Sequence, residues 1–349
     1  MTLPAKVRVG IIGTGGIARS VHIPAYKKLG DRVEVVSAFD IVGERLAAVA
    51  DEANIPYRFT DIQQLLQGPE LDAVSICTPP SSHAEFSEAA FRAGLHVLCE
   101  KPISNDVAGT RRVLDAARAS GKKLMVGFQN RFTWQTVALK AMISAGELGS
   151  IYYTRALATR RRGIPGWGVF TSKELSGGGP LMDIGSHALD QAMYLIGNPT
   201  PVSVLGMTYL KLANQPGPNS FGPYQPDKME TEDFGVGLVR FADGSSLLIE
   251  ASWALNIEKN VHNIQVAGTK GGADCYPLKL NGAAHGMLYD TTVQEPRRPE
   301  NGQDAKVAHF IDCIQHDLEP LVTPSEILNV ATILSAIYES AETGQAVTL

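Results

Sequence analysis

The stretch VRVGIIGTGGIA at residues 7–18 decides the fold of this chain. Its first half is a short run of β-branched residues, which favours a buried strand at Val7–Ile12. Its second half is a glycine-rich turn of the form G-x-G-x-x-A, and a helical stretch follows to about Gly30. A strand that enters such a turn and leaves it as a helix is the dinucleotide-binding fingerprint of a Rossmann unit.

Each residue type in the turn has a physical reason. Gly13 permits the tight bend, and Gly15 lets the backbone approach a pyrophosphate. Ala18 occupies the third position of the fingerprint and keeps the helix close to the strand. The amides at the start of the helix, around Gly16 and Ile17, then face the phosphates. We therefore expect these five residues to bind the cofactor; a purely structural glycine turn is the alternative.

Asp40 indicates which cofactor is bound. It ends a second predicted strand, Val33–Phe39, about 20 residues after the turn, where a carboxylate accepts hydrogen bonds from the ribose hydroxyls of NAD. The same negative charge repels the 2′-phosphate of NADP. Arg45 lies nearby in the sequence, but its helical position favours a solvated side chain. The sequence thus predicts NAD, with NADP the less favoured cofactor.

The N-terminal part of the chain continues the alternation of strands and helices. This alternation predicts a parallel sheet covered on both faces, in a Rossmann domain that spans residues 1–130. The further strands are expected at Ala73–Cys77, His96–Cys99 and Leu124–Gly127, and two of the helices at Ser81–Ala93 and Val107–Ser120.

Two loops follow strands of this sheet at their carboxyl ends, which is where open α/β sheets bind ligands. The first reads CTPPSSH (residues 77–83) and contributes Thr78, Pro79 and His83 as predicted cofactor contacts, although an exposed or capping histidine explains His83 equally well. The second reads CEKP (residues 99–102) and contributes Glu100 and Lys101. A lysine there can hydrogen-bond a substrate hydroxyl and stabilise a developing alkoxide. An ordinary surface lysine is the alternative.

The pattern changes after about residue 130. Longer strand candidates follow one another, and the segment Ala242–Gly244 reads as a hairpin turn between two of them. We expect an α+β domain at 131–349 with a large, mostly antiparallel sheet. Its strands are predicted at Ile151–Thr159, Val202–Leu210, Thr231–Phe241, Ser246–Trp253 and Val261–Ala267, and its helices at Thr133–Ala145, His187–Ile196, Val307–His316 and Ser325–Ala341.

The segment SGGGPLMDIGSHALD (residues 176–190) carries the proton-handling candidates. Asp183 and His187 are four residues apart, so on a helix they lie on one face. The imidazole can accept the proton of an alcohol as hydride leaves, and the carboxylate can orient it or hold the substrate. The glycines before them permit a close approach of the backbone to a ligand. A helix-capping aspartate and a partly buried histidine are the alternative interpretation.

These motifs, GTGGIA, CTPPSSH, CEKP and GGGPLMDIGSHALD, occur in the order typical of the glucose–fructose oxidoreductase/inositol dehydrogenase/rhizopine catabolism (Gfo/Idh/MocA) family. The chain resembles that family over essentially its whole length, including the closing segments HFIDCI and AIYESAETG. The resemblance implies hydride transfer between a nicotinamide cofactor and a sugar or polyol, in homodimers or homotetramers built on the second sheet. Residue by residue, Lys101, Asp183 and His187 match the family's catalytic set. His187 is then the general base, Lys101 polarises the hydroxyl, and Asp183 positions substrate and histidine.

The substrate contacts are less sharply defined. Besides the three catalytic residues, we expect Arg131 and Arg160 to bind hydroxyls, a carboxylate or a phosphate, and Trp167 to stack on a sugar ring. A solvated basic edge is the alternative for the arginines. Neutral polyols such as inositols are the first substrate expectation, and a sugar phosphate stays open.

Bulk properties narrow the class of protein. The chain has 349 residues, enough for two domains, and a formal net charge of −5, which gives no general attraction to nucleic acid. The four cysteines show no metal-binding spacing, so no metal site is predicted and we expect buried free thiols. Neither a signal peptide nor an apolar run long enough for a membrane helix is visible. We expect a cytoplasmic protein that binds neither nucleic acid nor membrane.

The sequence therefore predicts an NAD-dependent dehydrogenase that oxidises a secondary hydroxyl of a sugar or cyclic polyol. One alternative keeps the fold and acts on a sugar phosphate or another sugar derivative. A second alternative, from a different class, is a non-catalytic NAD-binding regulator, which has no need of the general base that His187 would supply.

Overall fold

The computed structural model describes residues 6–295 and 301–349. The chain divides into two units, the first formed by Met1–Gln129 and Glu300–Pro324 and the second by Asn130–Pro299 and Ser325–Leu349. The N-terminal segment of the first unit ends at Gln129, and this unit also takes in Glu300–Pro324 from late in the chain. Helix α9 (Gly302–Gln315) belongs to the first unit, where it contacts the N-terminal helices and β1. Apolar periodicity predicted this helix but could not indicate which core it covers.

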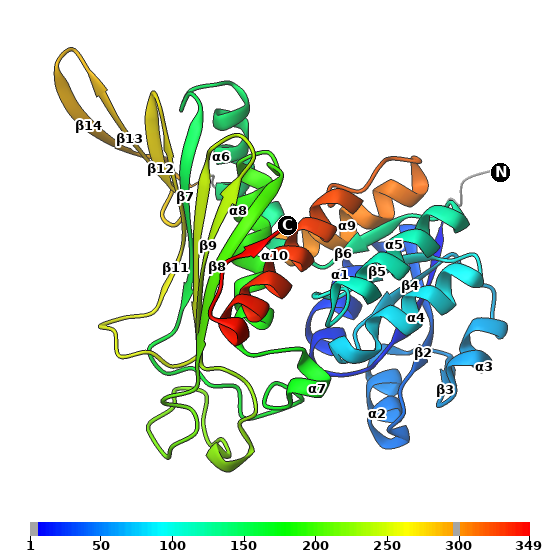
Figure 1. The fold of residues 1–349 in the computed structure, drawn as a ribbon. Coiled ribbons are helices and arrows are strands. Elements are labelled where there is room, and N and C mark those ends of the chain that lie inside the picture. The colour runs from blue at the N-terminus through cyan, green and yellow to red at the C-terminus, as the bar shows by residue number, and fades with distance from the viewer. Residues whose placement is uncertain (1–5, 296–300) are drawn as a thin grey trace. The chain divides into compact units, whose positions relative to one another are not determined.

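The first unit is built on a six-stranded parallel sheet with the order β3-β2-β1-β4-β5-β6 (Figure 1). This confirms the predicted Rossmann sheet. The order reverses between β1 and β4, so the crevice at their carboxyl ends is the expected dinucleotide site. The strands are β1 (Val7–Ile12), β2 (Val33–Phe39), β3 (Tyr57–Phe59), β4 (Ala73–Ile76), β5 (His96–Cys99) and β6 (Leu124–Val126).

The helices of this unit begin and end at recognisable signals. Asp61 and Asp106 accept hydrogen bonds from backbone amides at the starts of α3 and α5, and Gly121 ends α5 with a positive φ of 65°. Besides α9, the helical segments are η1 (Ala18–His22), α1 (Ile23–Lys28), η2 (Gly30–Arg32), α2 (Gly43–Ala53), α3 (Ile62–Gln67), α4 (Pro80–Arg92) and α5 (Val107–Ser120).

The second unit is built on a nine-stranded sheet with the order β14-β13-β12-β11-β7-β10-β9-β8-β15. All neighbouring pairs are antiparallel except β7 and β10, which confirms the predicted mostly antiparallel sheet. The expected hairpin turn at Ala242–Gly244 joins β9 to β10. The strands are β7 (Ile151–Thr159), β8 (Pro201–Tyr209), β9 (Phe234–Phe241), β10 (Ser246–Ser252), β11 (Val261–Gly268), β12 (Gly271–Asp274), β13 (Lys279–Ala284), β14 (Met287–Thr292) and β15 (Val347–Thr348).

Helices cover one face of this sheet. Gly206 and Gly237 lie directly under Ile337 of α10, and a Cβ at either glycine would overlap it. Helix α8 contacts β7 and β11 on the same covered face. The helical segments of the unit are η3 (Gln129–Phe132), α6 (Trp134–Ser144), α7 (Lys173–Ser176), η4 (Leu181–Gly185), α8 (Ser186–Leu195), η5 (Pro226–Lys228) and α10 (Pro324–Thr343).

The other face of the sheet is open and partly apolar. Because side chains alternate along a strand, the face opposite the helices carries Leu205, Leu238 and Leu248 in one register row across β8, β9 and β10. Leu205 and Leu238 are 46% and 42% exposed. An apolar row of this kind on a sheet face is a candidate contact surface.

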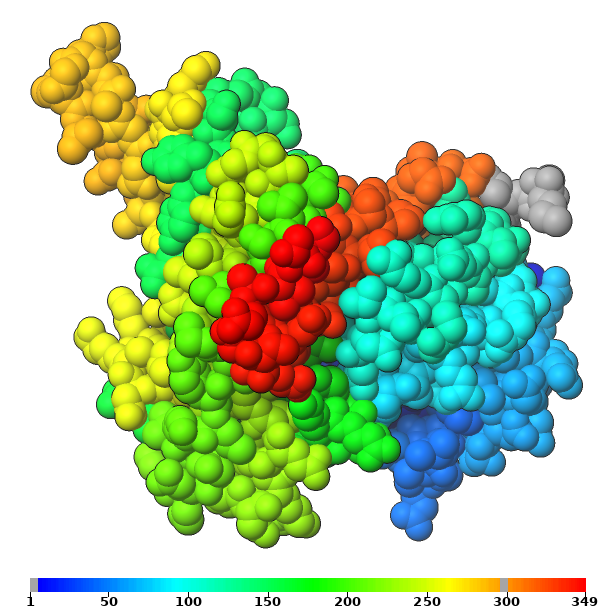
Figure 2. Space-filling model, in the orientation of Figure 1, coloured from blue at the N-terminus to red at the C-terminus, as the bar shows by residue number. Residues whose placement is uncertain are grey.

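Strands β13 and β14 form an arm that stands clear of the rest of the second unit (Figure 2). Every residue of β14 is exposed, and Leu288 reaches 90%. Strands β12, β13 and β14 were not predicted from the sequence, because their glycines, alanines and threonines give only a weak alternation of apolar and polar side chains.

The four cysteines, Cys77, Cys99, Cys275 and Cys313, are buried free thiols, as expected. Burial raises the pKa of each of them, which keeps the sulfur in its unreactive thiol form. Within residues 6–295 and 301–349, no helix is both long and apolar enough to cross a membrane.

Candidate active site

The glycine turn between β1 and η1 has the shape that the fingerprint requires. Gly13 has a φ of 92°, and a Cβ there would lie 2.8 Å from Thr78 Cγ2 and 2.9 Å from the carbonyl carbon of Cys77. At Gly15 and Gly16, by contrast, a Cβ would meet nothing within 4 Å. The backbone at these two glycines is therefore open to a ligand, while Ala18 is buried beneath it. This opening fits a dinucleotide pyrophosphate, with Ile17 half-buried at the start of the helix.

The Asp40 carboxylate is hydrogen-bonded to this turn. Its Oδ2 accepts hydrogen bonds from the Thr14 amide at 2.9 Å and the Thr14 hydroxyl at 2.8 Å. Arg45 donates to both carboxylate oxygens, at 2.9 Å and 2.6 Å. Arg45 is exposed, as expected, but its side chain also folds back from α2 onto the carboxylate five residues away. Burial alone would raise the pKa of Asp40, but the bonds from Arg45, Val42 and Thr14 lower it to about 2.

His83 is buried rather than exposed. Its Nδ1 lies 2.6 Å from the carbonyl oxygen of Pro102 and its Nε2 lies 2.7 Å from that of Thr78. The ring thereby links the loop after β4 to the loop after β5. Burial lowers the pKa of His83 and so favours the neutral ring, which donates from one nitrogen to one of these two carbonyl oxygens. Thr78 is half-buried and Pro79 exposed, so these two residues remain candidates for direct cofactor contact.

Glu100 is buried inside the first unit. Its Oε1 accepts hydrogen bonds from Lys306 Nζ at 2.7 Å and from His22 Nε2 at 2.8 Å. Burial would raise the pKa of Glu100, but Lys306 and His22 hold it well below its usual range. The carboxylate is thus engaged by protein groups, which supports a positioning role for Glu100 in place of the expected cofactor contact.

Lys101 follows directly after Glu100 at the end of β5. It is half-buried, and the Lys101–Pro102 peptide bond is cis. The anchored Glu100 on one side and the Pro102 carbonyl held by His83 on the other define the backbone from which this lysine extends. Its catalytic role stays a prediction.

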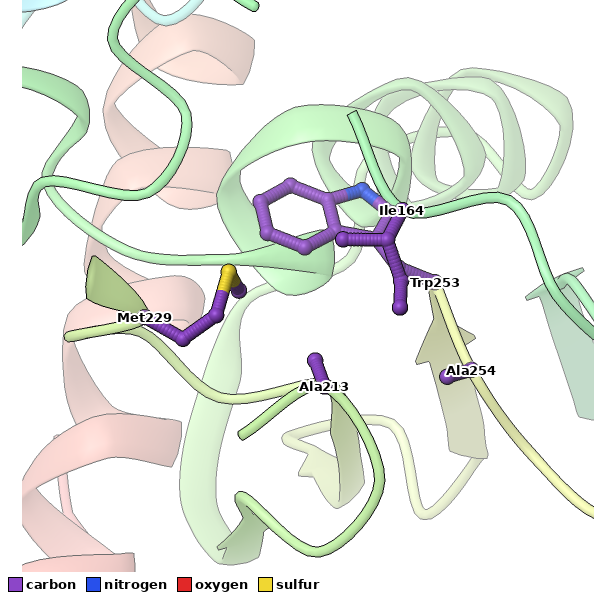
Figure 3. Packing of buried hydrophobic residues seen from close by; sticks show 5 residues of the cluster. All are labelled: Ile164, Ala213, Met229, Trp253 and Ala254. Atoms are coloured by element: carbon purple, nitrogen blue, oxygen red, sulfur yellow. The ribbon is translucent and has the colours of Figure 1, made fainter. Parts of the chain in front are cut away.

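Asp183 is held by a buried indole of the second unit. Trp253 Nε1 donates to Asp183 Oδ2 at 3.0 Å. The indole is fully buried among Ile164, Ala213, Met229 and Ala254 (Figure 3). An apolar cluster that immobilises the donor fixes the carboxylate in turn, which is the arrangement that a substrate-orienting group requires.

His187 lies one turn beyond Asp183. Asp183 belongs to η4, a single wide turn that runs into α8, and both side chains are half-buried. One turn further along α8, the buried Gln191 donates to Thr136 Oγ1 at 2.7 Å and Tyr276 Oη at 2.8 Å. The helix that carries His187 is therefore tied by side-chain hydrogen bonds to α6 and to the segment after β12. Asp183 and His187 thus lie one turn apart on a helical segment that is held at Gln191, and their action as a carboxylate–imidazole pair stays a prediction.

The glycines before Asp183 allow the backbone to pack closely against other residues of the second unit. A Cβ at Gly178 would overlap the Tyr338 hydroxyl, and one at Gly179 would overlap the Glu232 carbonyl oxygen. The Glu232 carboxylate accepts hydrogen bonds from the Gly179 amide at 2.9 Å and from Tyr338 Oη at 2.8 Å. The close approach expected at these glycines thus occurs, but toward Glu232 and Tyr338.

Arg160 and Trp167 meet around one aromatic ring. The Arg160 guanidinium lies 5.0 Å from the centre of the Phe221 ring, and the Trp167 ring centre lies 5.6 Å from it. Burial lowers the pKa of Arg160, and the nearby charge of Asp183 opposes that shift. Trp167 is 55% exposed. An exposed aromatic ring next to a cation near Asp183 is suited to a sugar, whose faces are apolar and whose rim is polar.

Arg131, unlike Arg160, does not contact an exposed aromatic surface. It is fully buried, and its guanidinium donates to Asp190 at 2.6 Å and to Glu326 at 2.9 Å. The Tyr194 ring covers it at 4.7 Å. A buried guanidinium committed to two carboxylates is typical of a structural ion pair, which favours a structural role for Arg131 over the expected substrate contact.

Trp253, Glu232 and Gln191 were not predicted from the sequence as site residues. Trp253 and Glu232 act on the segment 179–187 across long sequence separations, and nothing in their local patterns signals this. Gln191 carried a usable signal, because it continues the four-residue spacing of Asp183 and His187.

Comparison with known proteins decides the family. The sequence profile described as an oxidoreductase family NAD-binding Rossmann fold matches residues 7–128, and that of the same family's C-terminal alpha/beta domain matches residues 140–349. The chain belongs to the Gfo/Idh/MocA oxidoreductase family. This confirms the resemblance and the expected class of enzyme, an NAD(P)-dependent oxidoreductase.

Relatives with assigned names act on sugars. The D-glucoside 3-dehydrogenase of Escherichia coli is 37% identical over 99% of this chain and 98% of its own length. The D-xylose 1-dehydrogenase (NADP(+)) 2 of Haloferax volcanii is 30% identical over 97% of this chain and 99% of its own. Among solved structures, the aldose-aldose oxidoreductase of Caulobacter crescentus complexed with glycerol has a TM-score of 0.82 at 26% identity, covering 99% of this chain and all of that one.

Proposed function

We propose that this protein oxidises a secondary hydroxyl of a pyranose sugar or glycoside, with hydride transfer to a nicotinamide cofactor. The observation that carries the proposal is the Asp183–His187 pair, one turn apart, with Asp183 fixed by Trp253 and near an exposed aromatic–arginine surface. The full-length similarity to a D-glucoside 3-dehydrogenase supports the same substrate class. Cyclic polyols such as inositols are the second substrate class to test.

Each residue of the proposed site has a separate role in the reaction. His187 accepts the hydroxyl proton as the C–H bond breaks, and Asp183 orients the substrate hydroxyl and the imidazole. Lys101 donates a hydrogen bond to the reacting oxygen and favours the negative charge that develops there. Trp167 and Phe221 supply the apolar surface for the sugar ring. A nicotinamide cofactor held at the Gly13–Ala18 turn would supply the hydride acceptor.

The arginines already have partners within the protein, which favours a neutral sugar over a sugar phosphate as the substrate. Arg131 is buried with two carboxylates, and Arg160 donates to the Gly163 carbonyl at 3.1 Å and lies near Asp183. Arg162 donates to the Asn256 side chain at 2.7 Å. A phosphate would have to displace these partners.

The open face of the second sheet supports assembly of identical subunits. We propose that the row Leu205, Leu238 and Leu248 packs against a second copy of the chain, as a dimer or within a tetramer. The same face carries the Arg155–Glu250 ion pair beside the leucine row, so a copy turned by a two-fold axis presents matching apolar surface and opposite charges. The buried, unpaired cysteines support the expected cytoplasmic location.

The test is cofactor reduction across a substrate panel of alkyl glucosides, free aldoses, inositols and sugar phosphates, with NAD and NADP in parallel. Turnover is expected first with a neutral glucoside or aldose. The His187→Ala variant should lower that turnover by roughly two to four orders of magnitude, the range of general base catalysis. The matched control is His285→Ala, because His285 is an exposed histidine in the turn between β13 and β14.

Each result decides between the hypotheses. Near-normal turnover of His187→Ala would remove the general-base role. Turnover confined to sugar phosphates would favour the alternative substrate class. Cofactor binding without turnover on any member of the panel would favour the non-catalytic regulator.

A further inference from the structure

The choice between NAD and NADP depends on the Asp40 carboxylate, whose oxygens already accept as many hydrogen bonds as they can. Its Oδ2 accepts from the Thr14 amide, the Thr14 hydroxyl and Arg45 Nε, and its Oδ1 accepts from the Val42 amide at 2.9 Å and Arg45 Nη2 at 2.6 Å. A carboxylate has about four lone-pair sites. A ribose hydroxyl can therefore bond to Asp40 only after one of these donors leaves.

Arg45 is the donor that can leave. The Thr14 and Val42 amides belong to the backbone of the turn and of the strand end, whereas the Arg45 side chain is 47% exposed. The Asp40 carboxylate itself is only 2% exposed, so it needs other donors when the guanidinium leaves. Thr14 and Val42 still donate to it, and a ribose hydroxyl of NAD can take the place of Arg45.

While the pair is intact, it removes the barrier to NADP. A bare carboxylate repels the 2′-phosphate of NADP, but the bidentate Arg45 neutralises that charge at contact distance. The exposed guanidinium is also the group that binds phosphate best, since its planar fork donates two parallel hydrogen bonds. Arg45 therefore opposes the preference for NAD over NADP that Asp40 alone would impose.

We infer that Arg45 makes the cofactor site of this chain accept NADP as well as NAD, by neutralising Asp40 and by binding the 2′-phosphate. Asp40 and Arg45 both belong to the first unit, so this role of Arg45 does not depend on the identity of the sugar.

The experiment measures dissociation constants of NADH and NADPH by titration calorimetry, with no sugar present. For the wild-type protein, the two constants should differ by less than about tenfold. Arg45→Met, which keeps the length of the side chain, should weaken NADPH binding by about tenfold or more, the usual loss for a charge-assisted hydrogen bond. NADH binding should stay unchanged or become tighter, because Asp40 is released.

Two further variants separate this from a general effect on folding. Arg45→Lys keeps the charge but loses the planar fork, so its NADPH affinity should lie between those of wild type and Arg45→Met. Arg58→Met breaks an exposed arginine–aspartate pair in the same unit, with Asp51, and should change neither constant.

Two results would overturn the inference. One is equal weakening of NADH and NADPH by Arg45→Met, which would make Arg45 a structural support of the turn. The other is a wild-type protein that binds NADPH more than about a hundredfold more weakly than NADH, which would restore Asp40 as the sole determinant. Because the readout is binding, either result is independent of whether the proposed sugar oxidation is correct.

Discussion

At the scale of single residues, the site depends on groups that never touch a substrate. Trp253 holds Asp183 from within an apolar cluster, and Lys306 and His22 hold Glu100 beside Lys101. Each supporting group is buried, so its orientation is determined by packing. Substitutions that remove one polar atom and keep the shape of the side chain therefore test these roles most directly.

Trp253→Phe should impair catalysis more than stability. The variant keeps an aromatic ring in the cluster of Figure 3 but loses the N–H that donates to Asp183. A hydrogen bond to a charged group contributes about 1.5–3 kcal/mol, so kcat on the identified sugar should fall about tenfold or more. Steady-state kinetics with thermal unfolding as a companion measurement checks this.

Trp134→Phe is the matched control for that variant. The Trp134 Nε1 atom is buried without a hydrogen-bond partner among the described residues. Its loss should leave kcat unchanged. Equal losses of kcat in the two variants would show that the indole N–H of Trp253 is not what positions Asp183.

Lys306→Met should destabilise the first unit in a pH-dependent way. It leaves the buried carboxylate of Glu100 without its main counter-charge, which costs about 3–5 kcal/mol. In the wild type, the pKa of Glu100 lies well below normal, so its contribution to stability is present at neutral pH and lost only in acid. In the variant, burial raises that pKa, so protonation relieves the penalty as the pH falls.

Urea unfolding of this variant at pH 7 and pH 5 is the measurement. The deficit relative to wild type should be smaller at pH 5. Lys28→Met, which breaks an exposed pair with Asp304, should cost no more than about 1 kcal/mol at either pH. A deficit for Lys306→Met that is equal at both pH values would contradict the assignment of the cost to an ionised Glu100.

At the scale of elements, the turn η4 and the helix α8 form the platform of the proposed general base. The glycines before η4 let the chain pass close to Glu232 and Tyr338, and Glu232 binds the Gly179 and Leu181 amides. These amides are donors at the start of a helical segment, where internal partners are missing. The carboxylate therefore acts as a remote cap for the segment that carries Asp183.

Gly179→Ala should damage this platform. Its Cβ would overlap the Glu232 backbone, which cannot move as cheaply as a side-chain end, and overpacking of this kind costs about 1–3 kcal/mol. Gly43→Ala is the control, because a Cβ at that helix position meets only Thr60, at 4.0 Å. Thermal unfolding should show a clear loss for the first variant and none, or a small gain, for the second. Equal midpoints would mean that the 177–181 segment repacks freely.

At the scale of the whole molecule, the open face of the nine-stranded sheet leads to an assembly prediction. Leu238→Glu places a charge in the centre of the leucine row, so it should dissociate the proposed homo-oligomer into smaller species. Size-exclusion chromatography with light scattering measures this. Leu288→Glu is the control on the exposed arm formed by β13 and β14 and should leave the mass unchanged. Dissociation by Leu288→Glu alone would move the interface to the arm.

Sequence alone determined the features that depend on near neighbours. The strand–turn–helix of residues 7–18, the parallel and antiparallel halves, and the spacing of Asp183 and His187 all follow from local periodicity and turn chemistry. These patterns arise from interactions between residues within one or two turns of each other, so they do not depend on the rest of the chain. The order of the motifs then indicated the family, which the sequence profiles confirmed.

Only the tertiary structure decided which of the polar candidates are already occupied. Arg45 pairs with Asp40, Arg131 with Asp190 and Glu326, and Glu100 with Lys306, a residue more than 200 positions away in the sequence. The same holds for α9, which lies late in the chain but belongs to the first unit. For the pairs between residues far apart in the sequence, burial and ion pairing depend on which surfaces meet in the fold, and neither residue type nor local spacing indicates these contacts.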